Sequence, residues 1–304
     1  TYKTDVGLLE SARRSWMVDA GPRLDVLLLV DCAGAASDEA QLRPPAELDA
    51  ANPRLPRLHL RCFRLREDVS SADGEVTAVL NNFDKFGALV AVLLRDFPAK
   101  RWYVKLDTDT VLAFPNLLGF LSFLEWNVAE PKNAYFGDAG EKPERSNRPE
   151  DWAMYRVSRN SKDELMKRPG WRALVKEFLG HENKADAATI TYAHGGLEGF
   201  SADALRKIGE SDCVARVGAL PCDRSKKKNC INKPEDATVG LCAFLHRVAL
   251  IDCQPCMQNI AAAPVADWTR AELAKAFTPN ARFCARPISV HPVKNPEDQL
   301  VVYK

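Results

Sequence analysis

The sequence predicts an α/β fold in which a mainly parallel central sheet is flanked by helices. Two observations favour this class. Short apolar runs typical of buried parallel strands, at residues 26–30 and 102–106, each stop at a polar loop. Residues 8–17 and 81–96 instead carry apolar side chains at helical spacing. Strands that alternate with helices indicate a parallel sheet with helices on both faces.

Further elements are expected along the rest of the chain. Strands are predicted over residues 3–4, 58–65, 134–137 and 190–193, and helices are predicted to begin near Pro115 and near Pro234. The Trp and Phe side chains of residues 114–126 are expected in the core. Residues 138–187 are charged and polar, and we expect them to form an insertion or lid. The simplest domain organisation is one domain over residues 1–304.

Length and composition exclude several classes of protein. The chain has 304 residues, 46% of them hydrophobic, which is enough to build a core. Its 42 Lys and Arg residues nearly balance its 41 Asp and Glu residues, and this argues against nucleic acid as a partner. No glycine-rich dinucleotide or P-loop motif follows the first strand. No signal peptide or membrane-length apolar run occurs, and we interpret the start at Thr1 as that of a trimmed chain or a mature fragment, from which any membrane anchor would be missing.

The nine cysteines are the main indication of cellular compartment. Six of them fall between residues 213 and 256. A zinc site usually shows two close pairs, and here only Cys253 and Cys256 have that spacing. A thioredoxin-like redox centre would follow the first strand of a βαβ unit, which this pair does not. Disulfides in an oxidising compartment are therefore the favoured interpretation.

Two carboxylates follow the apolar run at residues 102–106. Asp107 and Asp109 are separated only by Thr108. Carboxylates at the carboxyl end of a strand can hold a hard divalent cation, which commonly binds phosphate oxygens as well. In open α/β sheets, ligands also bind at this end of the strands. The pattern indicates a metal and phosphate site.

The order of several short motifs along the chain suggests a family. Asp107-Thr108-Asp109 is followed by Gly195-Gly196, then by Glu235-Asp236, and last by His291 after residues 288–290. In this order and spacing the chain resembles the Fringe-like β1,3-glycosyltransferases, and within them the core 1 β1,3-galactosyltransferase group. The resemblance covers most of the chain. It implies the GT-A nucleotide-sugar transferase fold, which is Rossmann-like, as a single catalytic domain.

The resemblance also implies a metal and donor site. Asp107 and Asp109 match the metal-binding acidic motif, with Asp109 as the direct ligand, and His291 matches a histidine that completes the site. Nitrogen and oxygen ligands together suit Mn²⁺, with Mg²⁺ as the alternative. Thr108 stands where the family usually has a third acid, among the residues that bind the nucleotide. Thr4 and Asp31, at the ends of early strands, match residues that line the nucleotide pocket.

The resemblance implies that the glycine pair and the later acids serve the transfer step. Gly195 and Gly196 match a glycine pair at which the backbone approaches the donor sugar or the acceptor. Asp236 matches the general base and has Glu235 beside it in the catalytic acid pair. Cys230 and Cys242 bracket these acids, as a family disulfide does.

Together these expectations describe an inverting, metal-dependent enzyme. It would move a hexose from a UDP-sugar to a hydroxyl of a glycan or glycoprotein and form a β1,3 linkage. Galactose is the favoured sugar, with N-acetylglucosamine and glucose as alternatives. The expected location is the lumen of the secretory pathway, in the Golgi as a type II membrane protein, with secretion as the alternative.

Two other functions remain open. One is a catalytically inactive protein of the same fold that binds glycans or assists folding in a chaperone-like way. The other is a disulfide-rich extracellular protein whose acidic loop binds calcium. Calcium needs more oxygen ligands than Asp107 and Asp109 provide in one loop. Dependence on Mn²⁺ and UDP separates the transferase from the calcium-binding protein.

Overall fold

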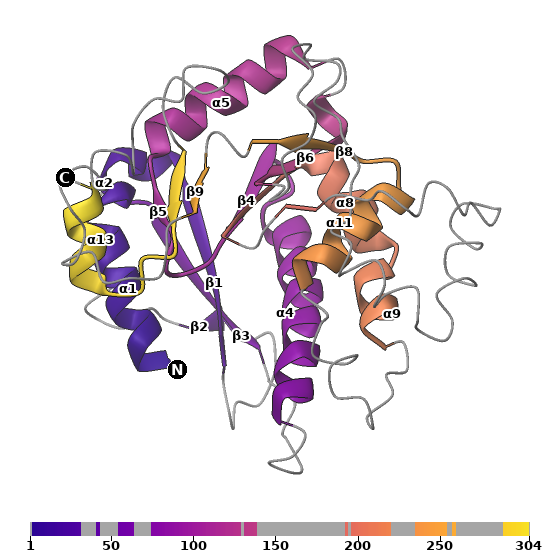
Figure 1. The fold of residues 1–304 in the computed structure, drawn as a ribbon, viewed down its shortest axis with the longest axis horizontal. Helices are drawn as coiled ribbons and strands as arrows, with labels where there is room; N and C mark the ends of the chain where they lie inside the picture. Colours follow the sequence, from indigo (N-terminus) through magenta and orange to yellow (C-terminus); the bar gives the residue numbers. More distant parts are fainter. Residues whose placement is uncertain are drawn as a thin grey trace. The chain divides into compact units, whose positions relative to one another are not determined.

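The computed structural model describes residues 2–31, 41–42, 54–63, 74–128, 131–138, 192–193, 196–219, 235–253, 257–259 and 288–303. The chain divides into two compact units, each of which is treated by itself. The first contains Thr1–Leu65, Leu106–Asn127 and Cys253–Lys304, and the second contains Arg66–Lys105 and Val128–Asp252. Both units contain helices and strands, so the α/β class is confirmed (Figure 1).

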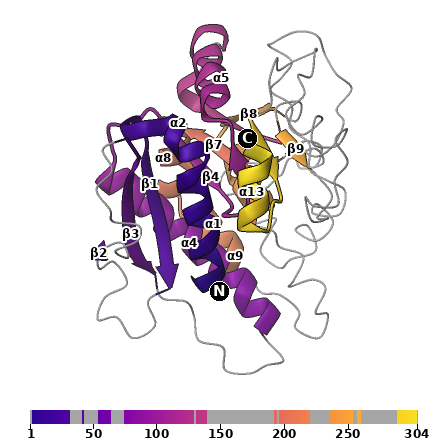
Figure 2. The same ribbon diagram turned by 90° about the vertical axis from the view of Figure 1, so that its left-hand side faces the viewer.

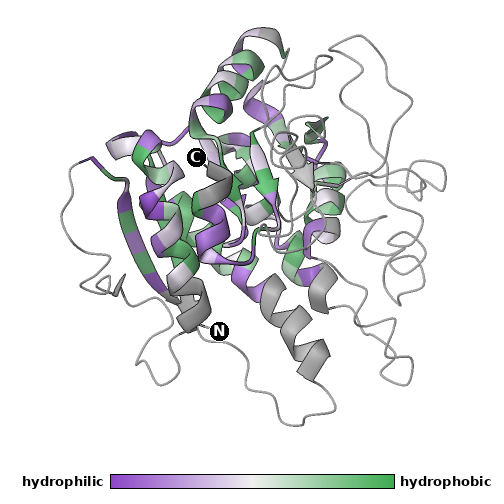
Figure 3. Ribbon diagram, turned by 60° about the vertical axis from the view of Figure 1, so that its left-hand side comes forward, coloured by the Kyte–Doolittle hydropathy of each residue, from purple (hydrophilic) through white to green (hydrophobic). Residues whose placement is uncertain are grey.

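The longest strands of the first unit form a three-stranded sheet. β1 (Asp25–Asp31) runs parallel to β3 (Arg57–Phe63), and β2 (Gln41–Leu42) lies antiparallel on the other side of β3. Hydrophilic and hydrophobic residues alternate along β3, as expected for a strand whose two faces meet different surroundings (Figure 3). The strands predicted near residues 26–30 and 58–65 are therefore confirmed.

A second, smaller sheet lies in the same unit. β10 (Ser289–His291) is its central strand, antiparallel to β5 (Val111–Leu112) and parallel to β9 (Met257–Asn259). Val290 pairs with Val111, and both side chains are fully buried. This pairing joins the segment that follows the two carboxylates to the segment that ends in His291.

The helices of the first unit come from both ends of its sequence. α1 (Tyr2–Arg14) lies beside α13 (Pro296–Tyr303) (Figure 2). The Ser11 hydroxyl donates a hydrogen bond to the Pro296 carbonyl. The other helices described in this unit are α2 (Trp16–Ala20), the short η1 (Gly21–Arg23) and α5 (Phe114–Asn127). Two sequence predictions are wrong here. Residues 3–4 lie in α1 and not in a strand, and Trp126, at the end of α5, has 87% of its surface exposed instead of lying in the core.

The second unit contains a four-stranded sheet in the order β4-β7-β6-β8. Its strands are β4 (Trp102–Leu106), β7 (Leu197–Ser201), β6 (Ala134–Gly137) and β8 (Ala249–Asp252). β6 is antiparallel to β7 and parallel to β8. The sequence predicted β4 and β6 with the observed bounds. It placed the next strand at residues 190–193, but residues 192–193 are not in a strand and the observed strand is β7.

Helices pack around this sheet and complete the core of the unit. Those in the described part of the chain are α4 (Gly74–Asp96), α8 (Ala202–Glu210), α9 (Cys213–Ala219) and α11 (Glu235–Leu245), with the short η2 (Pro131–Asn133) before β6. Phe86 of α4, Phe200 of β7 and Leu241 of α11 belong to one buried apolar cluster. α4 begins seven residues earlier than predicted, and α11 begins at the predicted acids.

Strand pairing is the main difference between the expected and observed folds. The described residues form three small sheets, each with an antiparallel pair, and no central parallel sheet is seen among them. The expectation of a mainly parallel sheet rested on the alternation of strands with helices. A run of apolar residues identifies a strand but not the strands that pair with it. The predicted insertion at residues 138–187 lies outside the described residues except for Asp138. None of the described helices has the length and apolarity needed to span a membrane.

Candidate functional site

The structure brings three of the predicted site residues together in the first unit. Asp107 and Asp109 lie in the turn between β4 and β5, and His291 is the last residue of β10. One ligand atom from each of these residues lies within 4.8 Å of the others. Asp107 is exposed, whereas the side chains of Asp109 and His291 each have 21% of their surface exposed. The group is therefore open to solvent on one side. We call these three residues the acidic–histidine group.

Backbone hydrogen bonds fix the two segments that carry this group. The Thr110 amide donates to the Asp107 carbonyl at 3.0 Å and closes the turn. The Val293 amide donates to the Asp109 carbonyl at 2.7 Å, and the Ala113 amide donates to the Ile288 carbonyl at the same distance. With the β5–β10 pairing, these bonds hold the acidic turn against the end of β10.

A buried glutamine further supports the turn. Gln299 of α13 is fully buried, and its Nε2 donates to the Thr108 carbonyl at 3.0 Å and to the Val293 carbonyl at 3.3 Å. It thereby links the acidic turn to the residues just after His291. Gln299 was not among the predicted site residues. The sequence feature that could have indicated it is a polar residue next to the apolar residues 300–302 of α13.

The side chains of the group already interact with one another. His291 Nδ1 lies 3.3 Å from Asp109 Oδ1 and 3.1 Å from the Thr110 hydroxyl. The hydrogen bond with His291 is the largest influence on Asp109 and lowers the pKa of its carboxyl. Burial opposes this shift, and the charges of His291 and Lys294 add to it. Asp109 is thus held as a carboxylate.

The donor set fits a divalent transition metal. Two carboxylates and one imidazole offer oxygen and nitrogen ligands, a combination that suits Mn²⁺ and Zn²⁺ better than Ca²⁺. A metal bound by only three protein ligands keeps positions for other oxygen ligands, such as those of a diphosphate. The group can therefore supply a cation to an anionic ligand.

The other residues predicted for the nucleotide and donor sites do not belong to the acidic–histidine group. Thr4 lies inside α1, so its predicted position at the end of a strand is wrong. The apolar spacing of residues 8–16 extends the helix back over it. Asp31 is the last residue of β1, as predicted. Gly195 lies outside the described residues, and Gly196 is buried in the turn before β7.

Glu235 and Asp236 form the first turn of α11 in the second unit. Lys105 of β4 lies close to Glu235, with Nζ 3.0 Å from its Oε2. The same Nζ lies 2.7 Å from Oε2 of Glu198 on β7. The side chain of Glu198 is fully buried, and those of Glu235 and Lys105 are 12% and 18% exposed. Two acids thus share one lysine away from solvent.

Tyr135 of β6 completes this arrangement. Its hydroxyl donates to Oε1 of Glu198 at 3.0 Å and accepts from the Ala193 amide at 2.9 Å. Its ring is fully buried and stacks on Phe200, with the ring centres 5.0 Å apart. We call Lys105, Glu198, Tyr135 and Glu235 the buried polar network.

The network changes the acidity of Glu235. Burial is the largest influence and raises the pKa of its carboxyl to about 8. The negative charges of Glu198 and Asp236 also raise this pKa, and Lys105 opposes them. Sequence reasoning identified Glu235 but missed Lys105, Glu198 and Tyr135. The sequence feature that could have indicated two of them is a single charged residue inside each of two mainly apolar strands, Lys105 in β4 and Glu198 in β7.

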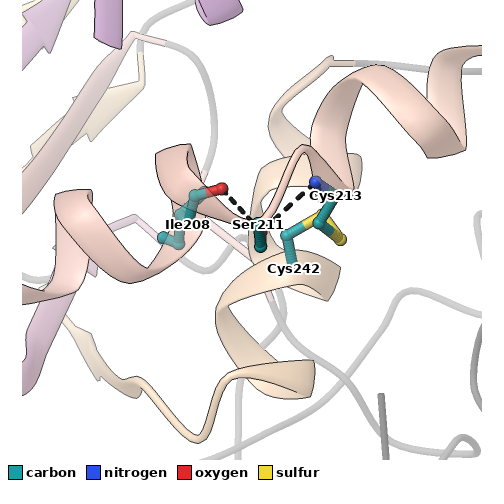
Figure 4. Close-up of a disulfide and its surroundings, with 4 residues drawn as sticks. All are labelled: Ile208, Ser211, Cys213 and Cys242. Carbon is teal, nitrogen blue, oxygen red and sulfur yellow. Dashed lines mark hydrogen bonds between the residues drawn. A yellow bond between two sulfur atoms is a disulfide. The ribbon is translucent and has the colours of Figure 1, made fainter. Parts of the chain in front are cut away.

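A disulfide ties the later part of α11 to its neighbour α9. Cys213 and Cys242 are bonded, with their Cα atoms 5.8 Å apart, and both are fully buried. Ser211 supports the start of α9, because its hydroxyl donates to the Ile208 carbonyl and accepts from the Cys213 amide (Figure 4). The expected Cys230–Cys242 pairing is wrong. Cys242 faces α9 in the folded unit, a proximity that distance along the sequence does not reveal.

Comparison with models of known protein families finds no match for this chain, and a search of curated proteins finds no relative.

Proposed function

We propose that this protein is a metal-dependent, inverting glycosyltransferase. It moves a hexose, galactose in the favoured case, from a UDP-sugar to a hydroxyl of a glycan or glycoprotein and forms a β1,3 linkage. N-acetylglucosamine and glucose are the alternative sugars. One observation supports the proposal most. Asp107, Asp109 and His291 come from two distant segments, and their ligand atoms lie within 4.8 Å of one another.

In this proposal the acidic–histidine group binds the donor. Asp107, Asp109 and His291 would hold Mn²⁺, or Mg²⁺ as the alternative. When bound, such a cation neutralises charge on the diphosphate that leaves. The low pKa of Asp109 keeps this ligand ionised at neutral pH. Gln299 supports the turn through its hydrogen bond to the Thr108 carbonyl.

The acids at the start of α11 serve the acceptor. Asp236 takes the proton from the acceptor hydroxyl as its oxygen bonds to the anomeric carbon. The bond from that carbon to the diphosphate oxygen breaks, and its electron pair leaves with UDP. A single displacement of this kind inverts the anomeric carbon, so an α-linked donor gives a β-linked product. No covalent intermediate with the protein is needed.

The proposed location is the lumen of the secretory pathway. The disulfide between Cys213 and Cys242 supports an oxidising compartment, because such bonds are rare in the cytosol. A Golgi membrane protein and a secreted protein both meet this requirement.

Binding and release of UDP test the proposal. Calorimetry measures UDP binding with Mn²⁺, with Mg²⁺ and with EDTA, and UDP release is measured for a panel of UDP-sugars with glycan acceptors. Asp109→Ala is expected to lose metal-dependent UDP binding. Asp236→Ala is expected to keep that binding and to lose about 10²- to 10⁴-fold in the transfer rate. Asp19→Ala, which removes an exposed acid of α2 in the first unit, is the matched control.

The outcomes separate the competing functions. Binding of UDP that does not depend on a metal, or no binding at all, would contradict the proposal. Metal-dependent UDP binding without transfer to any acceptor of the panel would favour an inactive protein of the same fold. Binding of Ca²⁺ without any effect of nucleotide would favour the calcium-binding alternative.

A further inference from the structure

The buried polar network contains more acid than base. Glu198 and Glu235 share the single ammonium group of Lys105, at 2.7 and 3.0 Å. One lysine can neutralise only one of two buried carboxylates, and an uncompensated buried charge is strongly destabilising. The network is therefore expected to keep one proton on one of the two acids.

Hydrogen bonding indicates which acid is ionised. Both oxygens of Glu198 accept a bond from a donor, since Oε2 receives Lys105 and Oε1 receives the Tyr135 hydroxyl. The Tyr135 hydroxyl cannot turn away easily, because it also accepts from the Ala193 amide. A carboxylate that accepts two bonds is stabilised in its charged form. Glu198 thus has the contacts of an ion.

Glu235 has the contacts of a neutral acid. Only its Oε2 is near Lys105, and its Oε1 is buried without a hydrogen-bond partner among the described residues. A charged oxygen without a donor is costly to bury, and a proton on the carboxyl removes that cost. The raised pKa of Glu235, at about 8, agrees with this arrangement.

We propose that Lys105, Glu198 and Tyr135 are positioning residues that hold Glu235 in its neutral form at neutral pH, so that Asp236 is the sole anion of the acid pair. This inference rests on the proposed function in assigning Asp236 the role of base. The neutral carboxyl of Glu235 then lies beside the base without repelling it.

Among the residues that the structure describes, three charged groups act on Glu235. The largest influences come from burial, from Glu198 of β7, from Lys105 of β4 and from Asp236 of its own helix. Other ionisable side chains belong to the elements that pack against α11, and they are not among these influences. Those described on α4, α8 and α9 are Asp84, Lys85, Arg95, Asp96, Asp203, Arg206, Lys207, Glu210 and Arg216.

Direct titration of the carboxyl is the first test. Protein labelled with ¹³C at glutamate Cδ is titrated by NMR without nucleotide, and Glu235→Gln identifies the signal of Glu235. We expect this signal to titrate near pH 8. In Glu198→Gln, which removes a neighbouring negative charge, the midpoint should fall by about one pH unit or more. In Lys105→Met, which removes the neighbouring positive charge, it should rise.

Control variants and a measurement of folding distinguish a specific effect on Glu235 from loss of structure. Lys207→Met removes an exposed lysine whose Nζ donates a hydrogen bond to the Asn133 side chain in the same unit, and it should leave the midpoint unchanged. Near-UV circular dichroism establishes that each variant is folded. If Lys105→Met does not fold, the test depends on Glu198→Gln, because glutamine has nearly the same shape as glutamate. A wild-type midpoint near 4.5, or one that Glu198→Gln does not move, would overturn the inference.

The pH profile of transfer gives the second readout. The rate should fall above about pH 8 as Glu235 ionises beside Asp236, and Glu198→Gln should move this decline to lower pH in step with the NMR midpoint. A decline that stays in place while the midpoint moves would also overturn the inference. Absence of UDP binding by the wild type would contradict the proposed function alone, because the carboxyl titration uses no nucleotide.

Discussion

Gln299 contributes to the candidate metal site without being one of its ligands. Its amide holds the Thr108 and Val293 carbonyls, which flank the acidic turn and His291 in the chain. Supporting contacts of this kind commonly matter for metal affinity almost as much as the ligands, because they orient them. The buried position of Gln299 therefore has a functional interpretation as well as a packing one.

Gln299→Met tests this role. Methionine has a similar volume but cannot donate the two hydrogen bonds, so Mn²⁺ affinity should fall by about 10- to 100-fold. Electron paramagnetic resonance of free Mn²⁺ measures the change. Glu297→Gln, an exposed substitution in the first turn of the same helix, should leave the affinity unaltered. Equal affinities of Gln299→Met and the wild type would show that the turn is ordered without this side chain.

At the scale of elements, the packing of β7 against β6 requires a glycine next to Glu198. Gly199 pairs with Phe136 of β6, and a Cβ atom at residue 199 would collide with the Phe136 ring. The ring also contacts Trp102 of β4 edge to face, so it has little room to move away. Close packing of these strands sets the position of Glu198 and hence of the buried polar network.

Gly199→Ala is expected to destabilise the protein by about 1–3 kcal/mol, the usual cost of overpacking a core. Gly87→Ala is the matched control, because an alanine methyl at this position of α4 would meet no described atom outside its own helix within 4 Å. Alanine there should instead stabilise the helix by up to about 1 kcal/mol. Urea unfolding measures both variants. A Gly199→Ala variant as stable as the wild type would mean that β6 and β7 can separate at little cost.

Sequence patterns predicted individual elements better than their partners. The bounds of β4 and β6 follow from apolar runs that end at Asp107 and Gly137, since such runs are local. Strand order, the Cys213–Cys242 pair and the Lys105–Glu198 contact join residues far apart in sequence, and periodicity carries no information on them. His291 was predicted as a metal ligand from a family resemblance and not from the residues around it. Its place beside Asp109 could not have been derived from spacing alone.

At the scale of the whole molecule, the acidic–histidine group and the buried polar network belong to different units. The acidic–histidine group lies within the first unit, and the buried polar network and the disulfide lie within the second. Ligands and redox conditions are therefore expected to act on different parts of the chain.

Hydrogen exchange read by mass spectrometry tests this expectation. Mn²⁺ at 100 times its dissociation constant should add about 2.7 kcal/mol of protection, largest around residues 107–112 and 288–293. Reduction of the disulfide, whose cysteines are 29 residues apart, should remove about 3–4 kcal/mol, largest in α9 and α11. Asp109→Ala should abolish the first effect only. Equal changes in both units under each treatment would contradict this assignment.

The shared lysine also has a consequence for how this sequence can change over evolution. Loss of Lys105 alone would leave two buried acids without a counter-ion, and loss of Glu198 alone would leave the Tyr135 hydroxyl without its acceptor. Either single step passes through a less stable protein, whereas joint replacement by neutral side chains does not. We therefore expect descendants of this chain to inherit Lys105, Glu198 and Glu235 as a set, or to have lost them together.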